Sequence, residues 1–357
     1  MLNPEFWKGK RVFVTGHTGF KGSWLCLWLN HLGAQVSGYA LPPPTDPSLF
    51  EMAKVADLID SHNGNVHDLA SLEAAMKAAQ PEIVIHMAAQ SLVRYSYDQP
   101  VETFTTNVLG TVHLLDAVRR APSVRAVVVV TSDKCYFNEE WVWGYREDSR
   151  LGGHDPYSAS KGCAELVVTA YQNSFFSAER NPGCAAVGSA RAGNVIGGGD
   201  WAVDRLLPDF FRARERGQPV EVRHPDAIRP WQHVLEPLSG YLRLAERLVE
   251  HGPTASGAWN FGPADEDARP VRWILDYLSA RVPGTRWQAE PGPQVHEAHH
   301  LKLDSSKART QLGWAPVWTL ASALDRTIEW HEAWRERLDM RRLCLAQIEA
   351  RQPAGQG

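Results

Sequence analysis

The sequence lacks three features that would place it in other classes of protein. No apolar run approaches the ~20 residues that a membrane span needs, so we expect no transmembrane helix. Basic residues are not in excess, because 37 Lys and Arg face 41 Asp and Glu, for a net charge of -4. The chain therefore has no electrostatic basis for binding nucleic acid or an anionic membrane surface.

Paired cysteines and clustered metal ligands are also missing. The five cysteines are scattered, odd in number and without CxxC spacing, which is typical of reduced thiols in a cytoplasmic protein and argues against a zinc site. His17, His86 and His233 lack metal-ligand spacing, so we predict no metal. The first ten residues are polar and lead directly into an apolar stretch, so we expect no secretory signal peptide.

What the sequence does have is material for a large core. With 357 residues and 44% hydrophobic content, the chain can bury two lobes. Short apolar runs, read as buried strands, alternate with helical patterns. The expected strands are residues 11–15, 35–40, 82–88, 125–131 and 185–192, and the expected helices are 20–32, 69–79, 101–120 and 156–176. This alternation predicts an α/β fold with a Rossmann-type, doubly wound parallel sheet.

A glycine-rich loop follows the first predicted strand. Gly16, Gly19 and Gly22 lie between that strand and the first long helix. Glycines let the backbone turn tightly and approach a pyrophosphate, which binds to amides at a helix N-terminus. We therefore interpret the loop as a dinucleotide site rather than a purely structural turn. The residues assigned to the cofactor here are Gly16, His17, Thr18, Gly19, Phe20 and Gly22.

A second pattern joins a strand end to the helix after it. Ser132, Asp133 and Lys134 close the strand at residues 125–131, and Tyr157 and Lys161 follow about 25 residues later. A Tyr and a Lys four apart lie on one face of a helix. The ammonium can stabilise the phenolate and lower a tyrosine pKa that starts near ~10, so that the Tyr becomes a usable base.

Together, the GxxGxxG loop, the Ser and the Tyr-Lys pair resemble the extended short-chain dehydrogenase/reductase family over nearly the whole chain. The resemblance implies NAD as cofactor, and a Tyr157 that takes the proton of a substrate hydroxyl while hydride leaves to the nicotinamide. A simple alcohol oxidation uses Ser132, Tyr157 and Lys161 but needs neither Asp133 nor Lys134.

Those two extra residues resemble the sugar-nucleotide 4,6-dehydratases within that family. Such enzymes oxidise C4 of a hexose, eliminate water across C5 and C6, and return the hydride to C6. The resemblance implies that Asp133 is the acid for the leaving hydroxyl, if a dry site raises its pKa. Lys134 then removes the C5 proton in its neutral form, which the positive charges of Lys161 and oxidised nicotinamide favour. The alternative is a surface ion pair at a strand end.

Lysine at position 134, where these enzymes usually carry Glu, resembles the CDP-glucose 4,6-dehydratase branch. Other stretches support the same resemblance: residues 6–10, 133–136, 140–145, 193–201 and 228–233. The implied reaction converts CDP-D-glucose to CDP-4-dehydro-6-deoxy-D-glucose and water, in dideoxysugar or cell-surface polysaccharide synthesis. The base of the nucleotide rests on this resemblance alone.

The resemblance also suggests further contacts with the cofactor. Asn65, followed by Val66, lies where the family generally has an Asp facing the adenine amine, and Ala88 and Ala89 close a strand where the ribose or nicotinamide passes near the backbone. Close helix–sheet packing explains the two alanines equally well. Residues 38–41, at the end of the second strand, carry neither an acid for the adenosine ribose nor an Arg for a 2′-phosphate, so this position does not separate NAD from NADP.

A diphosphate-sugar substrate calls for arginine donors on the second lobe. Arg229 fits best, because its Arg-Pro-Trp stretch resembles the family's diphosphate-binding segment. Surface salt bridges are the alternative for each arginine. The candidate substrate residues are Gln90 and Arg94, by position, and Asn194, Arg205, Arg223 and Arg229.

The expected organisation is an NAD-binding Rossmann domain over residues 1–193, with Ser132, Tyr157 and Lys161, and a mostly α-helical sugar-nucleotide lobe over 194–350. We expect the second lobe to cross back to the sheet, and residues 351–357 to form a flexible tail. Family resemblance implies a homodimer or a dimer of dimers, through the helices at 101–120 and 156–176.

Other functions stay open. The nearest is another sugar-nucleotide enzyme on the same fold, a GDP-mannose or dTDP-glucose dehydratase or a 4-epimerase. A remoter alternative is a non-catalytic NAD(P)-sensing protein, although such a protein has no use for Ser132, Tyr157 and Lys161 together.

Overall fold

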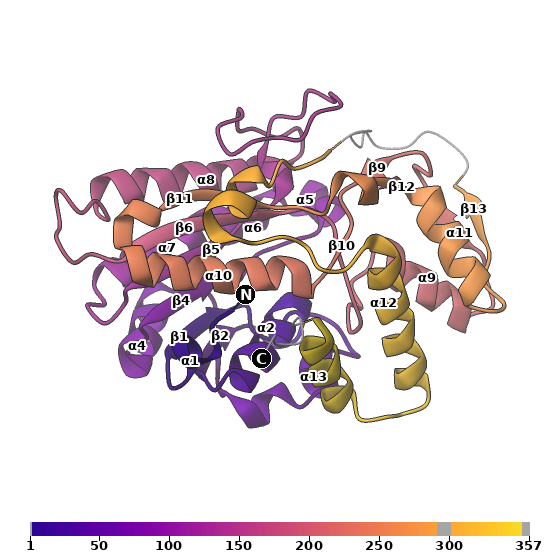
Figure 1. Ribbon diagram of the computed structural model, residues 1–357, viewed down its shortest axis with the longest axis horizontal. Coiled ribbons are helices and arrows are strands. Elements are labelled where there is room, and N and C mark those ends of the chain that lie inside the picture. The colour runs from indigo at the N-terminus through magenta and orange to yellow at the C-terminus, as the bar shows by residue number, and fades with distance from the viewer. Residues whose placement is uncertain (1, 291–300, 352–357) are drawn as a thin grey trace.

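A seven-stranded parallel sheet forms the centre of the computed structural model, which describes residues 2–290 and 301–351 (Figure 1). The strand order is β11-β6-β5-β4-β1-β2-β3. The strands are β1 (Arg11–Thr15), β2 (Gln35–Ala40), β3 (Asp60–Asn63), β4 (Ile83–His86), β5 (Ala126–Val130), β6 (Ala186–Ala192) and β11 (Gly257–Phe261). The order reverses between β1 and β4, and in such sheets ligands bind outside the carboxyl ends of the strands at that point.

The Rossmann-type fold that the sequence predicted is confirmed. Strands β1 and β2 have the predicted bounds, while β4, β5 and β6 are shorter than their predicted runs by one to three residues. Two strands were not predicted. The sequence of β3, Asp-Ser-His-Asn, is polar and carries no apolar signal, and β11 lies in a segment that we expected to be helical.

Helices cover both faces of the sheet. One face packs against α2 (Phe20–His31), α10 (Leu235–His251) and α13 (Met340–Arg351). The other packs against α4 (Leu69–Ala79), α7 (Gly110–Arg119) and α8 (Pro156–Ser174). The predicted helix at 101–120 is α6 (Pro100–Phe104), a π-helical turn at Thr105–Leu109, and α7. Because both faces are buried, the inner strands are nearly continuous apolar runs, as in Ala-Val-Val-Val-Val of β5.

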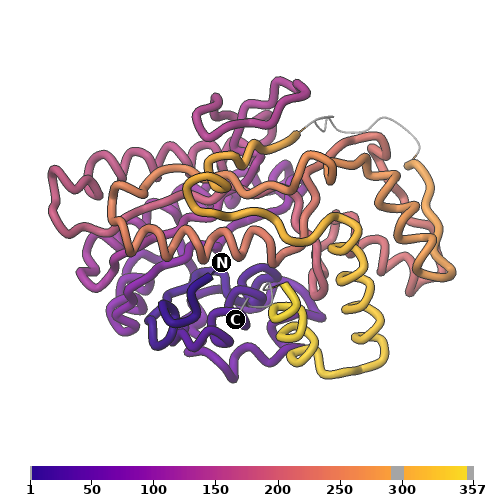
Figure 2. Tube along the Cα trace, viewed as in Figure 1, coloured from indigo at the N-terminus to yellow at the C-terminus, as the bar shows by residue number. Residues whose placement is uncertain are grey.

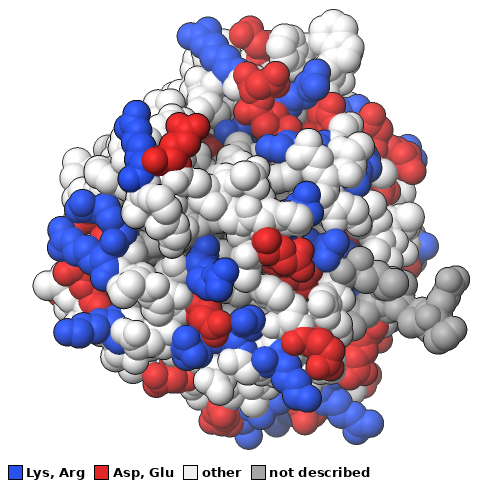
Figure 3. All heavy atoms as spheres, turned by 60° about the vertical axis from the view of Figure 1, so that its left-hand side comes forward, with Lys and Arg blue, Asp and Glu red and all other residues white. Residues whose placement is uncertain are grey.

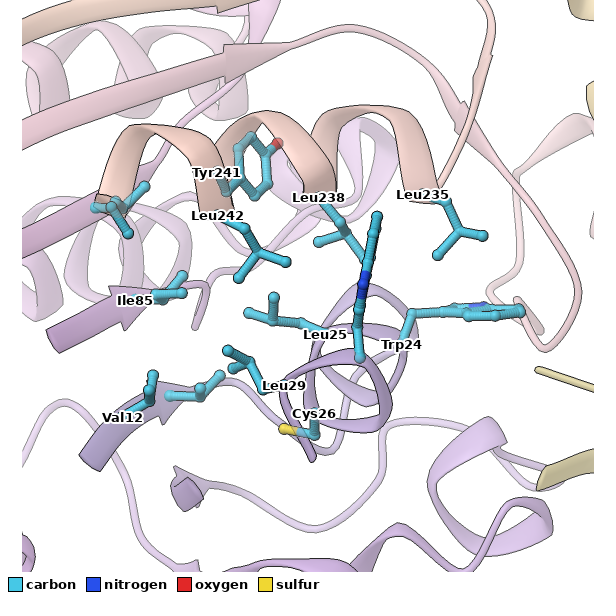
Figure 4. Packing of buried hydrophobic residues seen from close by; sticks show 14 of the residues in the cluster. Val12, Trp24, Leu25, Cys26, Leu29, Ile85, Leu235, Leu238, Tyr241 and Leu242 are labelled. Carbon is cyan, nitrogen blue, oxygen red and sulfur yellow. The ribbon is translucent and has the colours of Figure 1, made fainter. Parts of the chain in front are cut away.

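The packing between α2 and α10 brings the second half of the chain onto the first. In Figure 4, Leu238 and Leu242 of α10 point toward Leu25 and Leu29 of α2, with Ile85 of β4 below them. All five side chains are fully buried. This contact places α10 on the same face of the sheet as α2, where it packs against β5 and β6.

A smaller lobe with its own core lies beside the sheet, at the right of Figures 1 and 2. Its helices are α9 (Leu206–Glu215), α11 (Val271–Arg281) and α12 (Leu320–Arg335). Three short pairings join its strands: β7 (Val195–Ile196) with β10 (Gln232–His233), β8 (Val220–Val222) with β13 (Trp287–Ala289), and β9 (Ile228–Arg229) with β12 (Arg269–Pro270), the last antiparallel. Shorter helical elements are α1 (Pro4–Trp7), α3 (Leu49–Met52), α5 (Val93–Asp98) and the turns at Val55–Leu58, Asp133–Cys135, Gly252–Ala255, Asp265–Asp267 and Ala308–Leu312.

The chain does not divide between the two lobes at a single point. Helix α10 and strand β11 come after residue 193 but lie against and within the sheet. Helix α13 returns to the first half, where Arg341 Nε donates to Ala53 O at 2.7 Å. The expected boundaries at 193 and 350 stay predictions. Of the expected tail, Arg351 ends α13, and residues 352–357 lie outside the described residues.

Within the described ranges, no helix is both long and apolar enough to cross a bilayer. On the face in Figure 3, positive and negative side chains are intermingled and do not form a patch of one sign. This distribution agrees with the small net charge of -4.

Candidate active site

The Ser-Asp-Lys sequence forms a tight turn at the carboxyl end of the central strand β5. Ser132 is the N-cap of a 3₁₀ turn over Asp133–Cys135, and its Oγ accepts from the Lys134 amide at 3.2 Å. A serine hydroxyl in this position satisfies an amide that the turn leaves without a partner. Ser132 and Asp133 are buried, while Lys134 is partly exposed.

Helix α8 supplies the second half of the site. Asp155 caps it by accepting from the Ser158 amide at 2.9 Å, and Pro156 occupies the first helical position. Tyr157 and Lys161 therefore lie on successive turns, facing the end of β5. The Lys161 ammonium donates to Val130 O at 3.4 Å. The structure thus brings together the Ser, Tyr and Lys that the sequence predicted.

Burial changes the acid strength of the Tyr157–Lys161 pair. It raises the pKa of Tyr157 to about 12, against a smaller lowering by its side-chain hydrogen bond with Ser132. Burial also lowers the pKa of Lys161 to about 8, although the Glu165 carboxylate opposes this change. A positive charge from a bound nicotinamide would favour loss of a proton from the pair.

Burial makes Asp133 a weaker acid than an aspartate in water. Burial raises its pKa, while Lys134, Ser132 and Arg229 act in the opposite direction. Its Oδ1 accepts from Ser132 Oγ at 3.0 Å, but Oδ2 has no hydrogen-bond partner among the described residues. The backbone leaves no spare room there, because a Cβ on Gly193 would lie 3.0 Å from Oδ2. A buried carboxyl oxygen that lacks a partner, beside Tyr157 and Lys161, is free to hydrogen-bond with a hydroxyl group of a substrate.

The glycine loop at residues 16–22 has the shape that a dinucleotide requires. Gly16 has φ of +75°, and a Cβ there would lie 2.7 Å from Ala88 N. A Cβ on Gly22 would lie 2.1 Å from Gly16 O. Gly19 is the N-cap of α2, so the loop joins β1 to a helix N-terminus beside the point where the strand order reverses. These residues fit a pyrophosphate-bearing cofactor.

The other predicted cofactor positions surround this loop. His17 is turned into the protein, where its Nε2 lies 2.8 Å from Ser61 Oγ and burial lowers its pKa to about 4. Asn65 uses its side-chain oxygen on the His67 amide at 3.0 Å. Of the remaining positions, Thr18 donates its hydroxyl to Leu41 O, and Ala88 packs on Gly16. Phe20 and Ala89 are half-buried, and Val66 is buried. Direct contact of these side chains with a cofactor stays a prediction.

Two of the predicted substrate arginines lie at the catalytic groups. Arg205 acts electrostatically on Tyr157, and Arg229 acts on Asp133. Arg205 also pairs with Asp200 at 2.9 Å and donates to Ser91 Oγ at 2.9 Å. Arg229 is buried at the end of β9. Their binding of a diphosphate stays a prediction that this placement favours.

The structure does not place the other substrate candidates as close to the chemistry. Gln90 uses its side-chain amide within its own loop, on Thr103 Oγ1 at 2.8 Å and Leu92 O at 3.1 Å. Arg94 forms an exposed ion pair with Asp204 at 2.8 Å. The last two are Asn194, whose backbone oxygen accepts from Gln232, and Arg223, which follows β8 near Asp209.

Sequence reasoning missed two residues of the site, Lys21 and Tyr241. Lys21 Nζ donates to Tyr241 OH at 2.9 Å, and both side chains lie within electrostatic range of Asp133. Burial, with added repulsion from Lys161 and Arg205, lowers the pKa of Lys21 to about 7. Its place inside the glycine loop was an available signal. Tyr241 had none, because only the packing of α10 brings it to the site.

No metal centre accompanies these groups. In the part of the chain that the structure describes, no group of three or more His, Cys, Asp or Glu could hold a metal ion.

A Rossmann sheet with this loop and a buried Ser-Tyr-Lys set defines an NAD-dependent short-chain dehydrogenase/reductase of the type that acts on nucleotide sugars. The model of the family described as GDP-mannose 4,6 dehydratase matches residues 13–252. The chain belongs to this family.

Known relatives agree with this assignment. The chain is 56% identical over 342 residues to "CDP-glucose 4,6-dehydratase" of Salmonella typhimurium, covering 95% of each chain. It is 28% identical to "UDP-glucose 4-epimerase" of Mycolicibacterium smegmatis, over 89% of this chain and 97% of the other. The solved structure "MoeE5 in complex with UDP-glucuronic acid and NAD" superposes with a TM-score of 0.75 at 26% identity, covering 91% of this chain and 100% of that one.

Two glycine substitutions test the assignment of the loop. Gly22→Ala should lower the melting temperature of the protein and abolish the shift produced by NAD, because its Cβ would lie 2.1 Å from Gly16 O. Gly19→Ala should leave the melting temperature of the free protein nearly unchanged, since its Cβ meets nothing closer than 3.4 Å.

The second variant is the discriminating one. We expect NAD to stabilise Gly19→Ala much less than the wild type, because the methyl group obstructs the path of a pyrophosphate to the helix amides. A full NAD-induced shift in Gly19→Ala, measured by thermal unfolding, would contradict the placement of the pyrophosphate at this loop.

Proposed function

We propose that this protein is a CDP-glucose 4,6-dehydratase, a hydro-lyase that converts CDP-D-glucose to CDP-4-dehydro-6-deoxy-D-glucose and water. The observation that carries the proposal is the junction of two sets of groups at one strand end. Tyr157 and Lys161 serve an oxidation, while Asp133, buried with an unpaired oxygen, and Lys134 serve an elimination. The 56% identity to the Salmonella enzyme of that name supports the choice of nucleotide.

The cofactor is NAD, held by the loop at residues 16–22. When bound, it takes the hydride from C4 of the hexose and returns it to C6, so that it is unchanged after each turnover. The relatives that bind NAD share this fold over nearly the whole chain.

In the oxidation, Tyr157 takes the proton of the 4-hydroxyl. Lys161 supports the phenolate, and the Ser132 hydroxyl orients the substrate oxygen. Because Lys161 has a lowered pKa of about 8 and Tyr157 a raised pKa of about 12, the pair must release one proton before the tyrosine can accept another.

In the elimination, the new C4 ketone makes the C5 proton acidic. Lys134 removes that proton as the base, while Asp133 gives its own proton to the C6 hydroxyl, which leaves as water. Lys134 then returns a proton to C5 as the hydride reaches C6. The sugar keeps its ketone at C4, and one molecule of water has been lost.

These steps leave a proton imbalance within the site that Ser132 can correct. Tyr157 ends the sequence with one proton too many and Asp133 with one too few. Ser132 hydrogen-bonds with both, donating to Asp133 Oδ1 at 3.0 Å. Its hydroxyl therefore offers a direct route for the proton from Tyr157 to Asp133.

The diphosphate of the substrate would lie against Arg205 and Arg229, which place positive charge beside the catalytic groups. Arg223, Asn194, Gln90 and Arg94 are proposed as further contacts. A homodimer or dimer of dimers is also proposed, supported by exposed apolar residues on the two helical segments, Val101 at 79% and Leu166 at 59% exposure. The five free cysteines support a cytoplasmic location.

The substrate is tested with a panel of CDP-, dTDP-, GDP- and UDP-hexoses. We expect the alkali-induced absorbance of a 4-keto-6-deoxy sugar from CDP-glucose and little from the others. Product from dTDP-glucose or GDP-mannose instead would show a dehydratase with another nucleotide. A change only at C4 would indicate an epimerase, and no reaction with any hexose would favour an NAD-sensing protein.

The Lys134→Met variant tests the division of labour. It should form no dehydrated product from CDP-glucose, because nothing removes the C5 proton. It should still oxidise CDP-6-deoxy-D-glucose, which has no leaving hydroxyl, and the absorbance of reduced nicotinamide measures that oxidation. Tyr157→Phe should abolish both reactions. Equal losses of both reactions in Lys134→Met would contradict the role of Lys134 as the C5 base.

The pH dependence tests the Tyr157–Lys161 pair. With NAD in excess, kcat/KM should rise with pH to a plateau, and the midpoint of the rise should lie at or below the lysine value of about 8, since the active pair has lost one proton. Lys161→Met should lower kcat/KM by about 10²-fold or more and move the rising limb to higher pH. This direction follows because Tyr157, with a pKa of about 12, must then ionise without a neighbouring cation.

Lys10→Met is the control, because that lysine pairs with Glu82 at 3.1 Å beside the amino ends of β1 and β4, at the opposite end of the strands from the site. If the rising limb of the kcat/KM profile stays at the same pH in Lys161→Met, a group other than Lys161 sets the pKa of the base Tyr157.

A further inference from the structure

A buried ion pair lies directly behind the catalytic lysine and has no part in the proposed chemistry. Glu165 is on α8, one turn beyond Lys161, and its Oε2 lies 2.8 Å from Arg191 NH2 on β6. The two side chains are only 2% and 4% exposed. Desolvation makes such a pair weak evidence for stability, because well-packed apolar residues often serve as well. Stability alone therefore does not explain why this ion pair lies behind Lys161.

The pair reaches both ends of the catalytic turn. Thr131, the residue before Ser132, donates its hydroxyl to Glu165 Oε1. Tyr136, the residue after the turn, accepts from Arg191 NH1 at 2.7 Å. The catalytic segment 132–135 is thus bracketed by two hydroxyl groups that are both bonded to the same ion pair.

Neighbouring strands complete this network. Ser189 of β6 donates to Glu165 Oε2 at 2.7 Å, and Tyr136 OH donates to Asn260 Oδ1 of β11 at 2.8 Å. The carboxylate of Glu165 is therefore fixed from three sides, by Thr131, Ser189 and Arg191. Buried polar networks hold their bonded members in one geometry. Arg191 Nε is the exception here, because it has no hydrogen-bond partner among the described residues.

We propose that Glu165 and Arg191 are positioning residues that hold the turn bearing Asp133 and Lys134 against the helix bearing Tyr157 and Lys161. The proposal rests on the proposed function, since only a dehydratase must align two sets of groups on adjacent carbons of one sugar. An oxidation alone needs the helix and Ser132, whereas the elimination also needs the far end of the turn. Small errors in such alignment cost large factors in rate.

Glu165 has a second, electrostatic effect on the site. Its carboxylate raises the pKa of Lys161 and so opposes the effect of burial. Two groups act on the charge of Lys161: Glu165 on its own helix and Cys135 on the turn. Lys161 in turn lowers the pKa of Lys21 in the glycine loop and of His86 on β4 by electrostatic repulsion. Removing the charge of Glu165 should allow the Tyr157–Lys161 pair to lose its proton at lower pH.

The first test loosens one end of the bracket and leaves the ion pair intact. Tyr136→Phe removes the hydroxyl bonded to Arg191 and Asn260 but keeps the ring, which stacks on Tyr145 at 5.2 Å. We expect kcat with CDP-glucose to fall about tenfold, with oxidation of CDP-6-deoxy-D-glucose changed by less than about twofold. Equal losses in the two reactions would contradict a role in aligning the turn.

The second test removes the charge and is matched by a control elsewhere. Glu165→Gln should move the rising limb of the kcat/KM profile down by about one pH unit. Glu236→Gln breaks the other deeply buried pair, with Arg351 at 2.9 Å, where the two side chains are 0% and 8% exposed. Both variants should lower the melting temperature, but only Glu165→Gln should move the pH profile.

The outcomes separate this proposal from the function on which it rests. If the wild-type protein makes no 4-keto-6-deoxy product from any nucleotide hexose, the proposed function is wrong and the positioning role is wrong with it. If the wild type dehydrates CDP-glucose but Tyr136→Phe slows both reactions equally, or the pH profile of Glu165→Gln is unmoved, the positioning role alone is wrong. Should Glu165→Gln fail to fold, Tyr136→Phe decides the matter.

Discussion

Removal of the catalytic groups from water is the physical constraint on which this site depends. The same burial that raises the pKa of Asp133 and Tyr157 lowers the pKa of Lys161. In water, an aspartate is ionised at neutral pH, which is the wrong state for an acid that must protonate a leaving hydroxyl. Burial at the end of β5 shifts Asp133 toward its protonated form and brings the pKa of Lys161 down to about 8, with no metal ion required by the proposed mechanism.

The rest of the fold supplies that burial. The sheet brings the ends of β4, β5 and β6 to one edge, and helix α10, from the second half of the chain, packs on the adjoining face and brings Tyr241 to the site. Gly193 lets the backbone pass close to Pro230 and Asp133, because a Cβ there would lie 2.4 Å from Pro230 Cγ and 3.0 Å from Asp133 Oδ2. The arginines of the smaller lobe then add the positive charge that a diphosphate needs.

Two relatives with different activities are both similar in sequence to this chain, so particular residues and not overall similarity must distinguish the two reactions. The epimerase relative at 28% identity and the dehydratase relative at 56% both match nearly the whole chain. The fold and the Tyr-Lys pair are therefore compatible with either reaction, and fold alone does not imply function. What favours a dehydratase is the Asp133 and Lys134 that follow Ser132, to which we assign the roles of acid and base.

The sequence was a good guide wherever a local pattern carried the information. Strands β1 and β2 were predicted to the residue, because apolar runs between turns mark buried strands. The glycine loop and the Tyr-Lys spacing could be read for the same reason. Strand β3, made of Asp-Ser-His-Asn, could not be predicted, since only its pairing with β2 makes it a strand.

The sequence by itself therefore determined the order of the elements, the loop for the dinucleotide and the chemical types of the catalytic groups. These depend on spacing along one strand or one helix, which local geometry converts directly into position. Only the tertiary structure decided that Lys21 meets Tyr241, that Asp133 keeps an unpaired oxygen, and that Glu165 pairs with Arg191. Each of these involves elements far apart in the chain, and each depends on burial, which no single segment specifies.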